Sequence, residues 1–305
     1  MIFEKATLKS AFIAFAFILF LNFSLSAVEN APEQKKVLLA ILARNKAHVL
    51  SVFLKCIENL DYDKQLITIY INTNNNQDAT QEILVNWAEQ CKDQYNKIIL
   101  DIHEVEGASS TRPHEWTYDR FKLLGNIRNK SLQMTKENMC DYYFVVDCDN
   151  FISSCTLKEL IIKDKPIIAP MLLSIPEYKD RYSNFFCDIT ETGYYKDHPD
   201  YLTILYRTMQ GTFKVPVVHC TYLINADCID KLTYVDETND YEFVIFSRSA
   251  RDHNVDQYIC NEKQFGVQLH FHHDLTLKQE VKRFKKILPL IYLHLPDLVS
   301  NCINS

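Results

Sequence analysis

The sequence contains few glycines, only 5 among 305 residues. A fold that depends on several glycine-rich phosphate loops is therefore not expected, and a bound anion would rely on a metal ion, arginine or lysine. The formal net charge is −6, so the chain lacks the positive excess with which a general nucleic-acid binder neutralises phosphates. No Cys-x-x-Cys pair occurs, which disfavours a zinc ribbon or a thioredoxin-like site. The hydrophobic fraction of 47% and the charged fraction of 24% are ordinary for a globular protein.

The N-terminal segment is typical of a signal peptide. Lys5 and Lys9 precede an apolar run over 11–23 that a single asparagine interrupts, and small residues follow up to Ala27. The run has about 13 residues, fewer than the roughly 20 that a membrane-spanning helix needs. We therefore expect residues 1–27 to be removed and the protein to be exported to a secretory lumen, the periplasm or the cell exterior. An uncleaved membrane anchor is the alternative.

The remaining residues, 28–305, are expected to form one domain because they contain no internal repeat and no low-complexity linker. All ten cysteines lie in this part, and export would permit disulfides, although the sequence does not determine their pairing.

Apolar runs of strand length alternate with amphipathic segments in the first half of the chain. Strands are expected at 37–43, 66–71, 98–105 and 142–147, with helices at 47–60, 80–87 and 118–135. This alternation predicts βαβ units and a Rossmann-like, mostly parallel α/β sheet flanked by helices. The second half is less regular. It contains expected strands at 166–171 and 215–223, and a basic amphipathic helix at about 279–295 that Pro289 is expected to break.

Two aspartates follow the fourth expected strand directly, as Asp147-Cys148-Asp149. Side chains two residues apart in an extended segment point the same way, so both carboxylates can converge on one cation. Ligands of open α/β sheets bind beyond the carboxyl ends of the strands. Carboxylates suit Mg²⁺ or Mn²⁺ held together with substrate phosphates. The alternative is an acidic pair that caps the following turn.

A second pair of acids, Asp240 and Glu242, lies just before a helix-like run at 243–250. In an inverting glycosyl transfer one carboxylate deprotonates the acceptor hydroxyl, and either residue could be this general base. The alternative is a helix start enriched in acids that complement the helix dipole.

Histidines near the C-terminus could supply a further metal ligand. Strand alternation would put His270 and His272 on one face, beside His273. Surface or packing roles are the alternative, and neither paired cysteines nor an HExxH motif supports zinc. His219, at the end of an apolar strand, either faces the same cleft or packs in the core.

Polar residues follow the first two expected strands, where the base and ribose of a nucleotide would lie. On the helix before the acidic strand, Arg128 could contact a diphosphate or support that edge. The candidates for binding a nucleotide are Arg44, Asn45, Asn72, Thr73, Asp78, Arg128 and Asp147.

Several blocks of the sequence occur in the order found in one family. They are LAILARN (39–45), ENLDY (58–62), DCDN (147–150), APML (169–172), YSNFFC (182–187), GYY (193–195), FKVPVVH (213–219) and CNE (260–262). Together they resemble the N-terminal glycosyltransferase domain of the procollagen galactosyltransferases, including the cerebral endothelial cell adhesion molecule branch. The resemblance covers roughly 37–266.

This resemblance implies a GT-A-like domain, a UDP-sugar donor that is UDP-galactose in the family, and a manganese-type metal at Asp147 and Asp149. It implies β-linked transfer to hydroxylysine of collagen-like chains in a secretory lumen. It also favours Glu242 as the base. The family has a pair of adjacent acids before this helix, and Glu242 occupies the position of the second acid, whereas Tyr241 occupies that of the first. The family has histidine where this chain has Lys263, so the resemblance supplies no metal ligand at that point.

The expected function is metal-dependent transfer of a hexose, with inversion, from a nucleotide-sugar donor to a protein or glycan acceptor. A catalytically silent domain that binds a sugar, nucleotide or protein is the alternative, and a zinc-dependent hydrolase built on the histidines is a third hypothesis.

Overall fold

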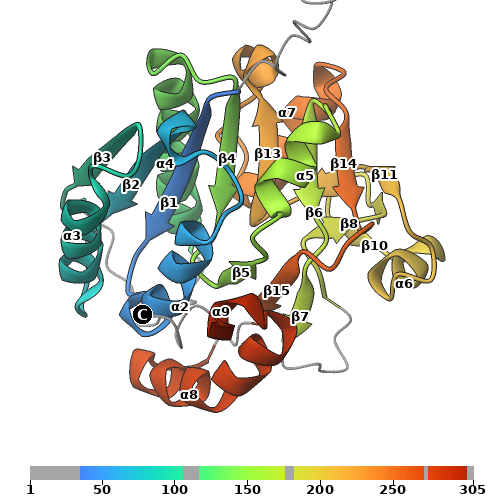
Figure 1. Ribbon diagram of the computed structural model, residues 1–305. Helices are drawn as coiled ribbons and strands as arrows, with labels where there is room; N and C mark the ends of the chain where they lie inside the picture. The colour runs from blue at the N-terminus through green and yellow to red at the C-terminus, as the bar shows by residue number, and fades with distance from the viewer. Residues whose placement is uncertain (1–34, 106–116, 176–181, 271–273, 301–305) are drawn as a thin grey trace, which may run out of the picture. The chain divides into compact units, whose positions relative to one another are not determined.

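An eight-stranded sheet organises the part of the chain that the structure describes (Figure 1). The computed structural model describes residues 35–105, 117–175, 182–270 and 274–300. The strand order is β11-β14-β6-β13-β4-β1-β2-β3. In chain order the strands are β1 Val37–Ala43, β2 Ile67–Thr73, β3 Lys97–Ile102, β4 Tyr142–Val146, β6 Ile167–Pro170, β11 Thr212–Val215, β13 Thr221–Asn225 and β14 Gln257–Cys260. Only β11 and β13 run against the others, which confirms a mostly parallel sheet.

Helices cover both faces of this sheet (Figure 1). They are α2 Ala47–Glu58, α3 Thr80–Cys91, α4 Tyr118–Glu137, α5 Thr156–Ile162, α6 Asp200–Leu205, α7 Glu242–Asp252, α8 Leu277–His294 and α9 Asp297–Ser300, with short 3₁₀ turns at Lys64–Leu66 and Ala226–Lys231. Alternate side chains of β1 point to opposite faces. Val37 and Leu39 pack in a hydrophobic cluster with α2, α3, α5 and α8, whereas Leu38 and Ala40 pack in a second cluster with α4, α6 and α7.

A smaller sheet, β5-β15-β7, lies beyond the carboxyl end of β4. Its strands are β5 Asn150–Ile152, β7 Leu173–Ile175 and β15 Gly266–Leu269. Gly266 has φ +145°, and a Cβ there would lie 2.1 Å from the Phe151 carbonyl oxygen. Only glycine allows β15 to approach β5 this closely. This approach brings the end of β15 beside Asp149, whose carbonyl accepts a hydrogen bond from Leu269 N at 2.9 Å.

The expected strand at 215–223 is wrong as a single element. The chain forms the end of β11, then β12 (Val217–Val218), which pairs with β8 (Phe185–Phe186), and then β13. Pro216 cannot donate to a ladder, and Cys220 has φ +65°, which turns the backbone out of the extended region. A further small hairpin joins β9 (Asp188–Ile189) to β10 (Tyr195–Lys196).

The expected break of the C-terminal helix at Pro289 is also wrong, because α8 continues through it. Phe284, Ile287 and Ile291 are buried on both sides of Pro289 and hold the helix to the core. Pro289 has no N–H to donate to the Lys285 carbonyl. Both residues are exposed, so the Lys285 carbonyl faces solvent.

The expected signal segment, residues 1–27, lies outside the described residues. Across the described ranges, no helix combines the length and the apolar character that crossing a bilayer requires. All nine cysteines in those ranges are free thiols.

Candidate active site

Asp147 and Asp149 lie in the turn that leads from β4 to β5. Asp147 N donates to the Cys220 carbonyl at 3.1 Å, and the Asp147 carbonyl accepts from Asn150 N at 2.9 Å, so the backbone of the turn is held on both sides. Their side chains are 26% and 25% exposed. Both carboxylates therefore lie at the rim of the sheet and within reach of a ligand.

Each of these carboxylates has its own cationic partner. Asp147 Oδ1 accepts from Arg128 Nη2 at 2.9 Å, and Asp149 Oδ2 accepts from Lys46 Nζ at 2.7 Å. Burial raises the pKa of Asp147 above its ordinary value, against the opposing effect of Arg128, and the negative charge of Asp149 raises it further. Burial also works to lower the pKa of Lys46, but the charge of Asp149 outweighs it and the pKa is raised. Lys46 is therefore an ammonium.

Arg128 joins Asp147 to Glu242. Arg128 projects from α4 and is 4% exposed, and its Nε lies 3.7 Å from Glu242 Oε1. Its Nη1 has no hydrogen-bond partner among the described residues. One turn before it, a Cβ on Gly125 would lie 2.6 Å from the Tyr234 carbonyl oxygen. The absence of a side chain at Gly125 thus lets α4 approach this segment and carry Arg128 into the site.

Glu242 is the first residue of α7 and is buried. Burial raises the pKa of its carboxyl, while the Arg128 guanidinium opposes that shift and Asp147 adds to it. A raised pKa makes a carboxylate a better proton acceptor, as a general base requires. Glu242 and Asp147 therefore share one buried cation.

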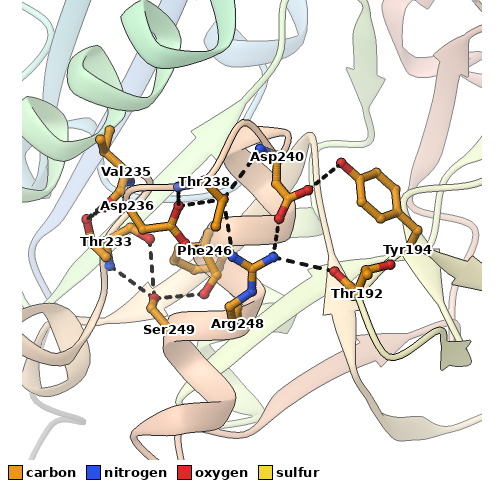
Figure 2. A network of polar contacts seen from close by, with 10 residues as sticks. All are labelled: Thr192, Tyr194, Thr233, Val235, Asp236, Thr238, Asp240, Phe246, Arg248 and Ser249. Atoms are coloured by element: carbon orange, nitrogen blue, oxygen red, sulfur yellow. Dashed lines mark hydrogen bonds and ion pairs between the residues drawn. The ribbon is translucent and has the colours of Figure 1, made fainter. Parts of the chain in front are cut away.

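Asp240 belongs to a different polar network, which Figure 2 shows. Its carboxylate accepts from the Tyr194 hydroxyl at 3.0 Å and from the Arg248 guanidinium, which also bonds Asp236 at 2.8 Å and the Thr192 carbonyl at 3.4 Å. Burial tends to raise the pKa of Asp240, but Arg248 and Tyr194 outweigh it and hold the pKa below its ordinary value. The network fixes the segment that leads into Glu242, because Arg248 is itself part of α7.

Asn45 and Asp78 tie the loop after β1 to the loop after β2. Asn45 N donates to Asn76 Oδ1 at 2.9 Å, and Asn45 Oδ1 accepts from Gln77 N at 2.7 Å. Asp78 accepts from Ala47 N at 3.1 Å and from Thr80 N at 3.0 Å. Asn45 and Asp78 thus shape the edge of the site by contacts within the protein.

Asn72, Thr73 and Arg44 lie in the same region. Asn72 Nδ2 donates to Asp101 at 2.9 Å, and the fully buried Thr73 accepts from Asn76 at 2.7 Å. Burial lowers the pKa of the half-buried Arg44, against an opposing charge on Glu104. The structure therefore gathers all five residues expected on the nucleotide side at the carboxyl ends of β1 and β2.

The histidines differ in their surroundings. His270 follows Leu269, the residue whose N–H bonds the Asp149 carbonyl. The ring of His270 meets the Tyr182 ring edge-on, with 6.0 Å between the ring centroids. His219 is buried among aromatic rings, where burial and the Arg128 charge lower its pKa to about 3. It is therefore a neutral imidazole. His272 and His273 lie outside the described residues.

The donor set can be tested for a metal ion. Among the residues that the structure describes, no three His, Cys, Asp or Glu side chains are gathered as a metal site. Two partly exposed carboxylates nevertheless fit Mg²⁺ or Mn²⁺, because these ions take one or two protein carboxylates and fill other positions with phosphates and water.

Lys46 was missed by sequence reasoning, which selected its neighbours Arg44 and Asn45. The available signal was a lysine at the start of a helix directly after a strand, where the helix dipole disfavours a cation. An anionic partner offsets this repulsion, and here that partner is Asp149.

The arrangement of sheet, helices and acidic turn is that of a GT-A glycosyltransferase fold. S. aureus TarS in complex with UDP-GlcNAc matches it with a TM-score of 0.52 at 14% identity, over 85% of this chain and 66% of that one. GalNAc-T7 with UDP, GalNAc and Mn²⁺ matches with a TM-score of 0.51 at 12% identity, over 83% and 48% of the two chains. These likenesses confirm the expected fold class.

The family follows from sequence. The profile of "Glycosyltransferase family 25, N-terminal domain" matches residues 34–288, and the chain belongs to this family. It is 36% identical to procollagen galactosyltransferase 2 of Mus musculus over 248 residues, which are 78% of this chain and 39% of that protein. Procollagen galactosyltransferase 1 of Danio rerio is 34% identical, over 78% of this chain and 40% of that protein. The resemblance seen in the sequence blocks is thus confirmed, and the chain spans about two fifths of the length of these relatives.

Proposed function

We propose that this chain transfers a hexose, galactose by analogy with its relatives, from a UDP-sugar to a hydroxyl acceptor with inversion. The observation that carries the proposal is the pair of partly exposed carboxylates, Asp147 and Asp149, at the carboxyl edge of the sheet beside the buried Glu242. The names of the relatives suggest a collagen-like acceptor. The family resemblance of the sequence blocks adds hydroxylysine as the reacting residue. Such an enzyme would act in a secretory lumen, and 28–305 would be its transferase domain.

Asp147 and Asp149 would hold Mn²⁺ or Mg²⁺, with His270 as the candidate for a further ligand. When bound, the ion would neutralise the charge that develops on the leaving diphosphate. The polar residues after β1 and β2 would face the uridine, and Arg128 would lie at the diphosphate end through its contact with Asp147.

Glu242 would be the general base that takes the proton of the acceptor hydroxyl. Burial raises its pKa, which makes it a better acceptor than the solvent-exposed acids of the surface, and the start of α7 fixes its direction. Asp240, whose pKa is held low by Arg248 and Tyr194, would support the segment before α7.

The test is release of UDP from a panel of UDP-sugars, with and without Mn²⁺, and with a collagen-derived hydroxylysine peptide as acceptor. The Asp147→Asn, Asp149→Asn double variant is the control. We expect metal-dependent release that is fastest with UDP-galactose, rises with acceptor and is lost in the double variant. Release that ignores both the metal and the double substitution would refute the proposal.

A catalytically silent domain is the second candidate, and one observation favours it. Both carboxylates that we propose to bind the metal are already paired with protein cations, Arg128 and Lys46. One relative, 32% identical over 77% of this chain, is named "Probable inactive glycosyltransferase 25 family member 3" in Bos taurus. A protein that binds UDP but releases none from any UDP-sugar, with or without acceptor, would support this candidate.

A further inference from the structure

The ion pair between Lys46 and Asp149 has no role in the chemistry proposed so far. Lys46 Nζ lies 2.7 Å from Asp149 Oδ2, and the two side chains are 21% and 25% exposed. They meet across a separation of 103 residues, between the loop after β1 and the turn after β4. The pair therefore lies at the same rim as the proposed donor site.

The position of Lys46 in its helix is electrostatically unfavourable without an anion. Lys46 is the N-cap of the 12-residue α2, and its own side chain makes no capping hydrogen bond to the helix. Its carbonyl accepts from Val49 N and Leu50 N, so its backbone is part of the helix start. A helix N-terminus attracts anions and repels cations, so the ammonium is held there by Asp149.

The backbone around Lys46 is fixed, which leaves the side chain as the movable part. Lys46 N donates to Thr80 Oγ1 at 2.7 Å, and the adjacent Ala47 N donates to Asp78 at 3.1 Å. The ammonium can therefore exchange one anion for another near the same place without a change in the loop.

The charges of the cluster favour such an exchange. Three carboxylates, Asp147, Asp149 and Glu242, face two cations, Arg128 and Lys46. A divalent cation at the two aspartates would reverse this balance and leave Lys46 beside a positive ion. The buried Arg128 Nη1, which lacks a hydrogen-bond partner within the described ranges, points to the same need for an added anion.

We propose that Lys46 has two alternative anionic partners, namely Asp149 in the absence of donor and a phosphate of the donor diphosphate once Asp149 binds a divalent cation. The inference rests on the proposed function, and it assigns Lys46 a direct part in donor binding. The ammonium competes with the metal for Asp149 and then contributes a charged hydrogen bond to the diphosphate.

The experiment measures binding and not turnover. Mn²⁺ affinity is followed by the electron paramagnetic resonance signal of free Mn²⁺, and UDP affinity by calorimetry at saturating Mn²⁺. The variants are Lys46→Met, which removes the charge, and Lys46→Arg, which keeps it. Lys55→Met is the matched control, because Lys55 lies on the same helix and pairs with Glu58 at 3.6 Å.

Lys46→Met is expected to weaken UDP binding roughly 10-fold to 100-fold, the effect of losing one hydrogen bond between charged groups. It is expected to strengthen Mn²⁺ binding about 3-fold, because a competing surface ion pair is lost. Lys46→Arg should bind UDP more tightly than Lys46→Met, and Lys55→Met should match the wild type in both measurements.

A UDP affinity of Lys46→Met within about 2-fold of wild type would overturn the inference. Weaker Mn²⁺ binding by Lys46→Met would also overturn it, because Lys46 would then only support Asp149. UDP binding by Lys46→Arg no tighter than by Lys46→Met would also overturn it. These three results leave the proposed function intact. Failure of the wild-type protein to bind UDP at any Mn²⁺ concentration would instead defeat both.

Discussion

Replacing Arg128 with methionine is expected to destabilise the protein through the charges it leaves behind. Arg128 and Glu242 have side chains only 5% and 8% exposed, and Asp147 is 26% exposed. Removing one partner of a buried ion pair costs about 3–5 kcal/mol because an uncompensated charge remains. Water reaches Asp147, so we expect the lower end, about 3 kcal/mol of lost unfolding free energy.

A double-mutant cycle separates this charge effect from lost packing. Glu242→Gln alone leaves Arg128 paired with Asp147 and should cost about 1 kcal/mol. In the Arg128→Met, Glu242→Gln double variant, only Asp147 is left without its cation. The loss of unfolding free energy should therefore be about 1 kcal/mol smaller than the sum of the losses in the two single variants. Urea unfolding followed by circular dichroism gives all four free energies.

Two results would refute this reasoning. A loss below about 1 kcal/mol in Arg128→Met would mean that the guanidinium is not a buried counter-charge. Strict additivity in the cycle would mean that Arg128 and Glu242 do not interact. Lys122→Met, a change on the same helix α4 at an exposed position, is the control and should cost less than about 0.5 kcal/mol.

Three further predictions concern other parts of the molecule. Glu242→Gln should lower the rate of sugar transfer about 10²-fold to 10⁴-fold, while Mn²⁺-dependent UDP affinity stays within about 2-fold of the wild type. Glu159→Gln is the control and should leave both the rate and the affinity unchanged. Equal losses in rate and affinity in Glu242→Gln would contradict a role as base. Burial alone would raise the pKa of Asp101, but hydrogen bonds from Lys130, Tyr70 and Asn72 lower it to about 2. The stabilisation by ionised Asp101 is therefore present above pH 4 and lost as the pH falls toward 2. Asp101→Asn should lower the free energy of unfolding by about 2 kcal/mol at pH 7 and by almost nothing near pH 2. A loss that does not depend on pH in urea titrations would contradict this. Gly125→Ala should cost about 1–3 kcal/mol because its Cβ would lie 2.6 Å from a backbone oxygen, whereas the Cβ of Gly211→Ala would meet only the Phe213 ring at 3.2 Å and should cost less; equal urea midpoints would show that α4 can move away.

Most strands and helices of the fold could be predicted from the local pattern of apolar residues in the sequence. The uninterrupted apolar run Val37–Ala43 is β1 with the bounds that its composition predicts, because a strand buried on both faces needs apolar side chains throughout. The helix expected at 243–250 was equally local, and α7 begins one residue earlier, at Glu242. The single strand expected at 215–223 was wrong for two reasons. Pro216 interrupts the ladder and is visible in the sequence, whereas Cys220 adopts φ +65° and nothing in the types of its neighbours indicates that conformation.

The sequence by itself determined the alternation of strands and helices, the two aspartates after β4 and the family of the chain, because these depend on neighbouring residues and on the order of short blocks. Only the tertiary structure decided which charges meet. Arg128 lies between Asp147 and Glu242, Lys46 reaches Asp149 from 103 positions away, and Arg248 takes Asp240 into a separate network. Such partners are set by the stacking of α2, α4 and α7 against the sheet, and the distance between two side chains on different elements is not contained in the spacing of either one.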